Sequence, residues 1–330
     1  MISKKFKKFF KNKKILVTGG TGLIGRELVK YLQILECNIA VVSIDKIKSK
    51  IKKVNYIYGD LTNFDFCKKI TKNMDYVFHV AGIKGSIDVT IQKPASFFVP
   101  LLMMNTNLLE ASRLNNVKRL VYTSSIGAYS PSRVFKEKND NFLGDPMDHY
   151  PGWAKRMAEM QIHAYKKQYN IKNFFIVRPC NVYGPGDNFD PKNAMVIPSL
   201  IFKILRGDNP LKVWGDGSAK RDFAFSRDVA FGLVQTLYYG TGKNKFMNIG
   251  SGKAVSIKKL VKTLYKIKNF QYIFDKKKSS GYPLRVMSIA EAKKTIKYMP
   301  RTSLYNGLKE TFDWFNSNKL EYKKRHNYFK

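Results

Sequence analysis

The amino-acid sequence predicts an α/β protein built on a Rossmann doubly wound parallel sheet, with a smaller C-terminal lobe. Up to about residue 180, short apolar runs alternate with segments whose apolar residues recur at helical spacing. A glycine-rich turn at residues 19–25 directly follows the first apolar run and opens the first helical segment. Strands that alternate with helices in this way pair in parallel.

The order of the elements follows from these runs. Strands are expected at residues 14–18, 38–44, 54–58, 76–80, 119–123 and 173–177, and helices at residues 23–35, 101–114 and 153–169. Beyond residue 180, turn residues become frequent, as in the segments 183–186 and 214–217. We therefore expect a basic tail over residues 1–13, a Rossmann domain over residues 14–180, and mainly a substrate-binding lobe over residues 181–330, with some return to the Rossmann domain.

The net charge of the chain is unusual. Lys and Arg number 60 against 24 Asp and Glu, which gives a formal charge of +36. Such a charge can indicate binding to nucleic acid or to anionic membranes. The excess is spread along the chain, and Lys, Asn, Ile, Phe and Tyr are abundant together, which favours a genome-wide base-composition bias. We therefore expect no specific nucleic-acid partner.

The N-terminal residues 2–11 interleave lysine with phenylalanine. Such a tail could lie on an anionic membrane surface, but the favoured interpretation is a solvated extension ahead of the first strand. No run approaches the roughly 18 apolar residues of a membrane span, and no secretory signal opens the chain. Cys37, Cys67 and Cys180 share no close spacing, so neither disulfides nor a metal site are expected. We expect a cytoplasmic protein.

The turn at residues 19–25 reads Gly-Gly-Thr-Gly-Leu-Ile-Gly. Glycines allow a tight turn and a close approach to a pyrophosphate, which the free N–H groups of the helix N-terminus then bind. Asp45 follows Gly25 by 20 positions at the end of the second strand. A carboxylate there binds the adenosine ribose and repels a 2′-phosphate. The pattern predicts NAD rather than NADP, although Lys46 and Lys48 could neutralise that repulsion.

Further cofactor contacts are expected where other strands end. Asp60 closes the third strand and is placed to reach the adenine edge. His79 ends the fourth strand, as a cofactor contact or as a packed histidine. With the turn, the predicted cofactor-binding residues are Gly19, Gly22, Leu23, Ile24, Gly25, Asp45, Asp60, Leu61, His79 and Ala81.

Several motifs together identify a family. Besides the glycine turn and the two aspartates, residues 123–129 read Thr-Ser-Ser-Ile-Gly-Ala-Tyr and residues 178–185 read Arg-Pro-Cys-Asn-Val-Tyr-Gly-Pro. From about residue 13 to residue 316 the chain resembles the extended short-chain dehydrogenase/reductases of the NAD-dependent epimerase/dehydratase family. Residues 187–198 and 213–223 resemble the substrate lobe of members that act on GDP-sugars. The resemblance implies an enzyme that uses NAD on a nucleotide-sugar, with a GDP-sugar favoured.

The family also implies roles for single residues. A Ser or Thr after the fifth strand binds the sugar hydroxyl, a Tyr removes its proton as hydride leaves for the nicotinamide, and a Lys holds the nicotinamide ribose. An ammonium group beside a phenol lowers the pKa of the phenol. The resemblance gives the serine role to Ser125 and the lysine role to Lys155, and it adds Arg178 to the cofactor contacts.

The tyrosine departs from the family spacing. Tyr-x-x-x-Lys places both side chains on one helix face, but Pro151 stands four residues before Lys155, and the nearest tyrosine is Tyr150. One extra residue rotates a side chain by roughly 100° around a helix. Because Pro151 and Gly152 mark a helix start, we expect Tyr150 to be a pre-helical residue that can swing inward as the acid/base. His149 is the alternative.

Two reactions of the family lack their usual groups here. Members that dehydrate the sugar carry Asp-Glu after the Ser or Thr, where this chain has Ile126 and Gly127. Members that epimerise beside a 4-keto group use a Cys and a His, where this chain has Gly127 and Met195. Oxidation or reduction at C4, or 4-epimerisation through a 4-keto sugar, is therefore favoured. A dehydratase or 3,5-epimerase with relocated acid/base groups and a non-catalytic NAD-binding protein stay open.

The resemblance also places the substrate. The expected substrate-binding residues are Ser125, Asn181, Val196, Lys203, Trp214, Arg221 and Arg285. Cationic side chains suit diphosphate oxygens, although each could instead be a solvated surface cation, and Asn181 could cap a turn. The helices expected at residues 101–114 and 153–169 are apolar on more than one face. In the family such a pair forms an intersubunit four-helix bundle, so we expect a homodimer.

Overall fold

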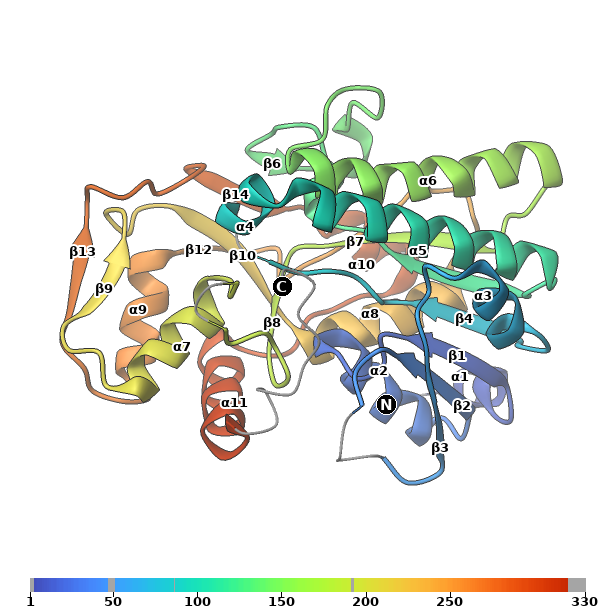
Figure 1. Ribbon diagram of the computed structural model, residues 1–330, viewed down its shortest axis with the longest axis horizontal. Coiled ribbons are helices and arrows are strands. Elements are labelled where there is room, and N and C mark those ends of the chain that lie inside the picture. The colour runs from blue at the N-terminus through green and yellow to red at the C-terminus, as the bar shows by residue number, and fades with distance from the viewer. Residues whose placement is uncertain (1–2, 47–50, 86, 191–192, 320–330) are drawn as a thin grey trace.

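The structure is a computed structural model that describes residues 3–46, 51–85, 87–190 and 193–319 (Figure 1). A seven-stranded sheet runs through its centre in the order β11-β7-β5-β4-β1-β2-β3. Every neighbouring pair is parallel. The strands are β1 (Lys14–Thr18), β2 (Asn38–Ser43), β3 (Val54–Tyr58), β4 (Tyr76–His79), β5 (Arg119–Thr123), β7 (Phe174–Pro179) and β11 (Met247–Ile249). The predicted doubly wound Rossmann sheet is confirmed.

The register of the central strands places their carboxyl ends at one edge. Thr18 of β1 pairs with Val42 of β2 and with His79 of β4, and Thr123 of β5 pairs with Val177 of β7. Loops that leave these strands therefore start beside one another. Ligands of such sheets bind at this edge, so the fold gathers the segments singled out in the sequence.

Helices cover both faces of the sheet (Figure 1). They are α2 (Leu23–Ile34), α3 (Phe64–Thr71), α4 (Ile87–Gln92), α5 (Pro94–Leu114), α6 (His149–Tyr169), α8 (Ser226–Tyr239) and α10 (Ala290–Ile296). The long helices α5 and α6 pack against each other, and α2 packs against α8. Thus α8 and β11, from the C-terminal half of the chain, complete the Rossmann part.

Two helices begin earlier than the sequence predicts. α5 starts at Pro94 and contains Pro100. α6 starts at His149, after Asp148, and not at Trp153. A proline is tolerated in a first helical turn because its missing N–H would have no acceptor within the helix there. Pro151 and Gly152 therefore do not mark the helix start, contrary to the expectation from the sequence, and Tyr150 lies inside the helix instead of before it.

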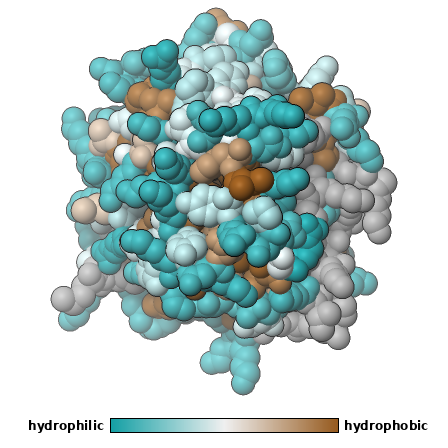
Figure 2. Space-filling model, turned by 90° about the vertical axis from the view of Figure 1, so that its left-hand side faces the viewer, coloured by the Kyte–Doolittle hydropathy of each residue, from teal (hydrophilic) through white to brown (hydrophobic). Residues whose placement is uncertain are grey.

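The C-terminal lobe has its own sheets and core. Its elements are β6 (Val134–Phe135), β8 (Asn181–Tyr183), β9 (Leu211–Trp214), β10 (Lys220–Phe225), β12 (Ala254–Ser256), β13 (Tyr272–Asp275), β14 (Leu284–Met287), α7 (Val196–Arg206), α9 (Ile257–Tyr265) and α11 (Leu304–Ser317). One sheet has the order β12-β10-β14-β6, with β8 on β10, and β9 pairs with β13. Its side chains, such as Ile201 and Leu260, form a second hydrophobic cluster. The side of the lobe seen in Figure 2 is mostly hydrophilic, with scattered apolar side chains.

The N-terminal segment forms a helix that packs on the Rossmann part. In α1 (Lys4–Phe10), Phe6 and Phe10 are buried while most lysines face outward. The Phe6 ring lies 4.6 Å from that of Tyr238, and the Phe9 ring stacks on Tyr76 at 5.2 Å. The expected solvated extension is therefore wrong for the described residues from position 3 onward. Within the described part of the chain, every helix is too short or too polar to cross a membrane.

The burial of α1 leads to a stability prediction. Because Phe10 is fully buried, Phe10→Ala should lower the free energy of unfolding by about 3–5 kcal/mol. Exposed Lys8 on the same helix provides the control, since Lys8→Ala should change stability by no more than about 0.5 kcal/mol. Urea unfolding followed by circular dichroism measures both. Equal midpoints for the two variants would show that α1 does not pack on the domain.

Candidate active site

The glycine turn has the close packing that a dinucleotide requires. Gly19 has a φ of +66°, and a Cβ added there would lie 2.7 Å from the Cα of Ala81. A Cβ on Gly25 would lie 2.2 Å from the carbonyl oxygen of Gly19. Helix α2 starts directly after Gly22, which offers no side chain to its first N–H groups. The turn therefore presents backbone N–H groups to an anionic ligand beside the end of β4.

The two aspartates predicted to bind the cofactor differ in their surroundings. Asp45 lies just past β2, and its N–H donates to the Ser43 hydroxyl at 3.0 Å. That hydroxyl lies 2.7 Å from the hydroxyl of Thr21 in the glycine turn, so Asp45 is tied to the turn. Asp60 is exposed and accepts from the N–H of Thr62 at 2.9 Å. The position of Asp45 suits a ribose contact beside the turn.

Lys155 and Ser125 extend from α6 and from the end of β5. The Lys155 ammonium donates to the Thr123 carbonyl at 2.8 Å and lies 5.1 Å from the centre of the Tyr122 ring. Burial lowers the pKa of Lys155 to about 8. The Ser125 hydroxyl is partly exposed and accepts from the N–H of Gly127 at 3.0 Å. The structure thus brings the lysine and the serine to the same strand end.

The neighbouring serine faces the other way. Ser124 is buried and donates to Glu159 of α6. Of the two serines after β5, Ser125 therefore remains for a ligand at the carboxyl edge, which supports the assignment made from the sequence.

Tyr150 does not take the predicted pre-helical position. It is the second residue of α6, is 52% exposed, and its ring lies 5.9 Å from that of Phe98 on α5, edge to face. Among the contacts of the described residues, none joins it to Lys155 or Ser125. Tyr150 therefore belongs to the outer side of the first turn, and its role as the acid/base stays a prediction.

Two residues predicted to bind the cofactor, His79 and Arg178, have fully buried side chains. His79 lies between the Thr18 hydroxyl, 2.8 Å from Nδ1, and the Asn105 amide oxygen, 3.0 Å from Nε2. Burial, with the charge of Lys155, lowers the pKa of His79 to about 3. Its side chain is therefore a packed, neutral histidine, which is the second of the two interpretations given above.

Arg178 also has a role different from the expected one. Its guanidinium donates to Glu159 at 2.6 and 2.8 Å and to Asp140 at 2.8 Å. The Cζ atom of the Arg178 guanidinium lies 3.7 Å from the centre of the Phe246 ring. Since the side chain is completely buried among these partners, its guanidinium has no free face for the cofactor contact predicted for Arg178. Arg178 instead holds α6 against β7 beneath the site.

The two arginines predicted to bind a diphosphate lie side by side. Arg221 of β10 is in register with Arg285 of β14. Arg221 donates to the carbonyl oxygens of Tyr282 and Ser280, and burial together with the charge of Arg285 lowers its pKa. Arg285 stacks on the Tyr282 ring at 4.2 Å, and its Nε is buried without a partner among the described residues. Two adjacent guanidinium groups favour an anionic ligand.

The remaining predicted substrate residues are spread over the lobe. Asn181 donates to the carbonyl of Asp222 at 3.0 Å and joins β8 to β10. Val196 and Lys203 are partly buried at the two ends of α7, and Trp214 is 53% exposed at the end of β9. No described contact joins Lys203 or Trp214 directly to the arginine pair, although Gly215, next to Trp214, packs against Ser280, whose carbonyl accepts from Arg221.

Two further residues that lie at this edge were not predicted from the sequence. Lys84, in the loop after β4, donates to Asp187 at 2.6 Å and so links the Rossmann part to the lobe. Asp148 precedes α6 and lies 3.4 Å from Arg285. In the sequence, Asp148 could have been recognised only as the last residue before a helix. Because the helix was predicted to begin at residue 153, this position was not recognised.

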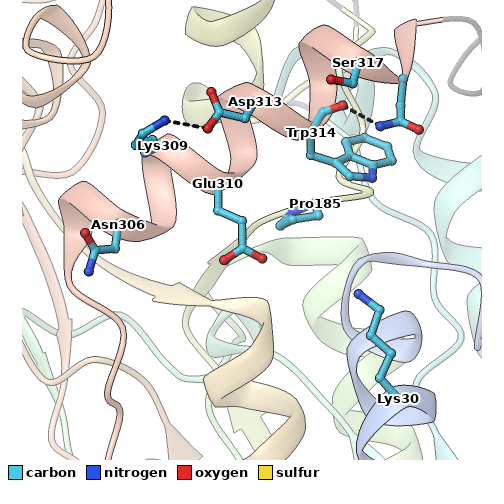
Figure 3. A pocket seen from close by; sticks show the side chains of 9 residues that line it. Lys30, Pro185, Asn306, Lys309, Glu310, Asp313, Trp314 and Ser317 are labelled. Carbon is cyan, nitrogen blue, oxygen red and sulfur yellow. Dashed lines mark hydrogen bonds and ion pairs between the residues drawn. The ribbon is translucent and has the colours of Figure 1, made fainter.

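A surface pocket of about 570 Å³ lies elsewhere, between α2 and α11. Figure 3 shows Lys30 facing Glu310 across it, with Trp314 and Pro185 on its wall. None of the residues predicted for the cofactor or the substrate lines this pocket. It is therefore distinct from the candidate active site.

Comparisons with known proteins agree with this geometry. Residues 15–250 match the NAD dependent epimerase/dehydratase family. The chain is 29% identical over 317 residues to GDP-L-fucose synthase of Sinorhizobium fredii, covering 93% of this chain and 96% of the relative. It is 29% identical over 313 residues to the putative UDP-glucose 4-epimerase of Methanocaldococcus jannaschii, covering 92% and 99%. The solved structure of MoeE5 in complex with UDP-glucose and NAD matches with a TM-score of 0.79 at 25% identity, covering 93% and 99%.

The sheet and the glycine turn therefore define a Rossmann-fold protein of the dinucleotide-binding class. The chain belongs to the NAD-dependent epimerase/dehydratase family. Members of this family are NAD-dependent nucleotide-sugar epimerases and reductases, and NAD is the cofactor. The glycine turn, into which no Cβ would fit at Gly19 or Gly25, suits that cofactor.

The buried histidine leads to a prediction about acid stability. Its folded pKa of about 3 lies below the ordinary value of 6.5, so the unfolded chain binds a proton that the folded protein excludes. The stability contributed by neutral His79 is therefore present above pH 6.5 and is lost as the pH falls toward 3. Between pH 7.5 and pH 5 the wild type should lose about 2 kcal/mol more stability than His79→Gln. Urea unfolding at the two pH values measures this difference, and identical losses would contradict the assignment.

Proposed function

We propose that the protein oxidises, reduces or epimerises a nucleotide-sugar at C4 through a 4-keto species. The observation that carries this proposal is the convergence of Ser125 and Lys155 at the end of β5, which only β4 separates from the strand that leads into the glycine turn. A hydroxyl that can bind a sugar hydroxyl and an ammonium group that can bind a ribose lie together there.

The residues of this chain divide the binding of NAD between them. The N–H groups at the start of α2 would bind the pyrophosphate, Asp45 the adenosine ribose and Lys155 the nicotinamide ribose. When bound, NAD accepts or returns the hydride at the sugar carbon. The carboxylate of Asp45 beside the glycine turn supports a preference for NAD over NADP.

The substrate would lie across the edge toward the lobe. Arg221 and Arg285 would bind the diphosphate, with Asn181 and Val196 nearby in the lobe, while Lys203 and Trp214 are candidates for the nucleotide end. The similarity to GDP-L-fucose synthase favours a GDP-sugar. A UDP-sugar is the second candidate, because the putative UDP-glucose 4-epimerase of Methanocaldococcus jannaschii is equally similar.

The residues at this edge also bear on the other reactions of the family. Ile126 and Gly127 form a short 3-10 turn directly after Ser125, and neither side chain can transfer a proton. Met195 precedes α7, where a thioether likewise has no proton to give. These positions favour C4 chemistry over dehydration or 3,5-epimerisation by the usual groups. A non-catalytic NAD-binding protein is the third candidate.

Hydride transfer tests the proposal directly. Wild-type protein incubated with NAD and either UDP-glucose or GDP-L-fucose should form reduced nicotinamide, measured by absorbance in a single turnover; it should accumulate in an oxidation and appear only transiently in a 4-epimerisation, which returns the hydride. Ser125→Ala should lower the rate by roughly 10²-fold with NAD binding intact, because it removes only the bond to the sugar hydroxyl. Lys155→Met should weaken NAD binding as well, because the lysine also holds the ribose. The same assay with NADP tests the preference assigned to Asp45.

Two results would contradict the proposal. Wild-type protein that binds NAD but transfers no hydride from either nucleotide-sugar would favour the non-catalytic alternative. Uptake of deuterium from solvent at C3, C5 or C6 would favour the dehydratase or 3,5-epimerase.

We also propose a homodimer formed through α5 and α6. Val99 and Met103 of α5 and Met157 and Met160 of α6 are 39–48% exposed, although the two helices already pack against each other. A second copy would cover these apolar side chains.

Sedimentation in solution tests the proposed dimer. Sedimentation at micromolar concentration should give a dimer, and the double variant Met103→Lys with Met160→Lys should shift it to a monomer because charge would be buried in the interface. Lys167→Glu, a charge change farther along α6, serves as the control. A wild-type monomer at that concentration would rule the dimer out.

A further inference from the structure

The first turn of α6 leaves no phenol in line with Lys155. Pro151 occupies the position four residues before the lysine, and Tyr150 lies half exposed against Phe98. Another group at the same edge is then better placed to receive the proton of the sugar hydroxyl. The group closest to these requirements is the carboxylate of Asp148.

The Asp148 carboxylate packs against the Cα of Gly127. A Cβ added to Gly127 would lie 2.2 Å from Oδ2 of Asp148, so only glycine leaves room for the carboxylate there. The N–H of Asp148 donates to the Gly127 carbonyl at 3.2 Å. The N–H of Gly127 in turn donates to the Ser125 hydroxyl at 3.0 Å. A single residue therefore positions both the carboxylate and the hydroxyl.

The second oxygen of the carboxylate faces the substrate lobe. Oδ1 of Asp148 lies 3.4 Å from Nη1 of Arg285, the arginine in register with Arg221. The side chain of Asp148 is 41% exposed, whereas that of Arg285 is 15% exposed. The carboxylate is thus open to a ligand, and it is linked to Ser125 through Gly127 and to the arginine pair through Arg285. A nucleotide-sugar whose diphosphate meets the arginines would place its sugar beside it.

We propose that Asp148 is a catalytic residue that exchanges the proton of the sugar C4 hydroxyl. This inference rests on the proposed function and deepens it, because it names the acid/base of the same site. A carboxylate can act as a general base in this way when it lies within hydrogen-bond reach of the hydroxyl.

The step balances with NAD as the oxidant. The C4–H bond breaks, and its electron pair leaves with the hydrogen as hydride to the nicotinamide. The O–H bond breaks, and its electron pair becomes the second bond of the C4 carbonyl. The proton passes to the Asp148 carboxylate, which becomes a neutral carboxylic acid, while Ser125 donates a hydrogen bond to the sugar oxygen. The return of hydride reverses each transfer.

Replacement by the isosteric amide tests the proposal. Asp148→Asn should lower the rate of hydride transfer from UDP-glucose or GDP-L-fucose by about 10²-fold or more at saturating sugar. Its affinity for UDP and GDP, measured by calorimetry, should change by less than about threefold, because the diphosphate contacts remain. Asp148→Glu keeps a carboxylate and should recover part of the rate. Asp145→Asn makes the same charge change at an exposed residue outside the site and should leave the rate unchanged.

A spectroscopic measurement follows the proton itself. In infrared difference spectra of the wild type, formation of the keto sugar should be accompanied by the band of a newly protonated carboxyl group. The Asp148→Asn variant, mixed at high concentration and followed to the same extent of reaction, should lack this band.

Three outcomes would overturn the assignment. If Asp148→Asn weakens UDP and GDP binding but keeps the rate at saturation, Asp148 only positions Arg285. If Tyr150→Phe lowers the rate more than Asp148→Asn does, the phenol is the acid/base. If the carboxyl band persists in Asp148→Asn, another group takes the proton. Each of these requires an active wild type, whereas an inactive wild type would contradict the proposed function instead.

Discussion

The candidate site depends on one buried ion pair, between Arg178 of β7 and Glu159 of α6. Both side chains are completely buried, with Asp140 as a second partner of the arginine. Removing one partner of such a pair leaves an unpaired buried charge, at a cost of about 3–5 kcal/mol. Glu159 also accepts from Ser124 at the end of β5. The pair therefore fixes α6 relative to β5 and β7, and with it Lys155 relative to Ser125.

The position of α6 also decides which side chains of its first turn can reach the site. α6 begins at His149, so Pro151 lies inside the helix, four residues before Lys155 and on the same helix face. Tyr150 packs against Phe98 of α5. The residue before the helix is then the one directed at the end of β5. Gly127 gives it room, because a Cβ at that position would overlap the Asp148 carboxylate.

The two halves of the chain are interleaved across the site. β6 from the first half joins the sheet of the lobe, and β11 from the second half completes the Rossmann sheet. Lys84 with Asp187 and Asp148 with Arg285 then link the two parts at the carboxyl edge. A substrate that spans this edge would contact groups on both sides.

The sequence by itself determined the Rossmann sheet and the glycine turn, and its motifs led to the prediction of Ser125 and Lys155, which the structure brings to the same strand end. These follow from apolar periodicity and from motifs whose residues are close in the chain. It could not determine the docking of α1, because a run of lysine and phenylalanine suits a solvated tail as well as a packed helix. Nor could it assign Arg178 to a buried pair or bring Asp148 to Arg285, 137 positions away. Those contacts join distant segments, and only the packing of the tertiary structure decides which of them meet.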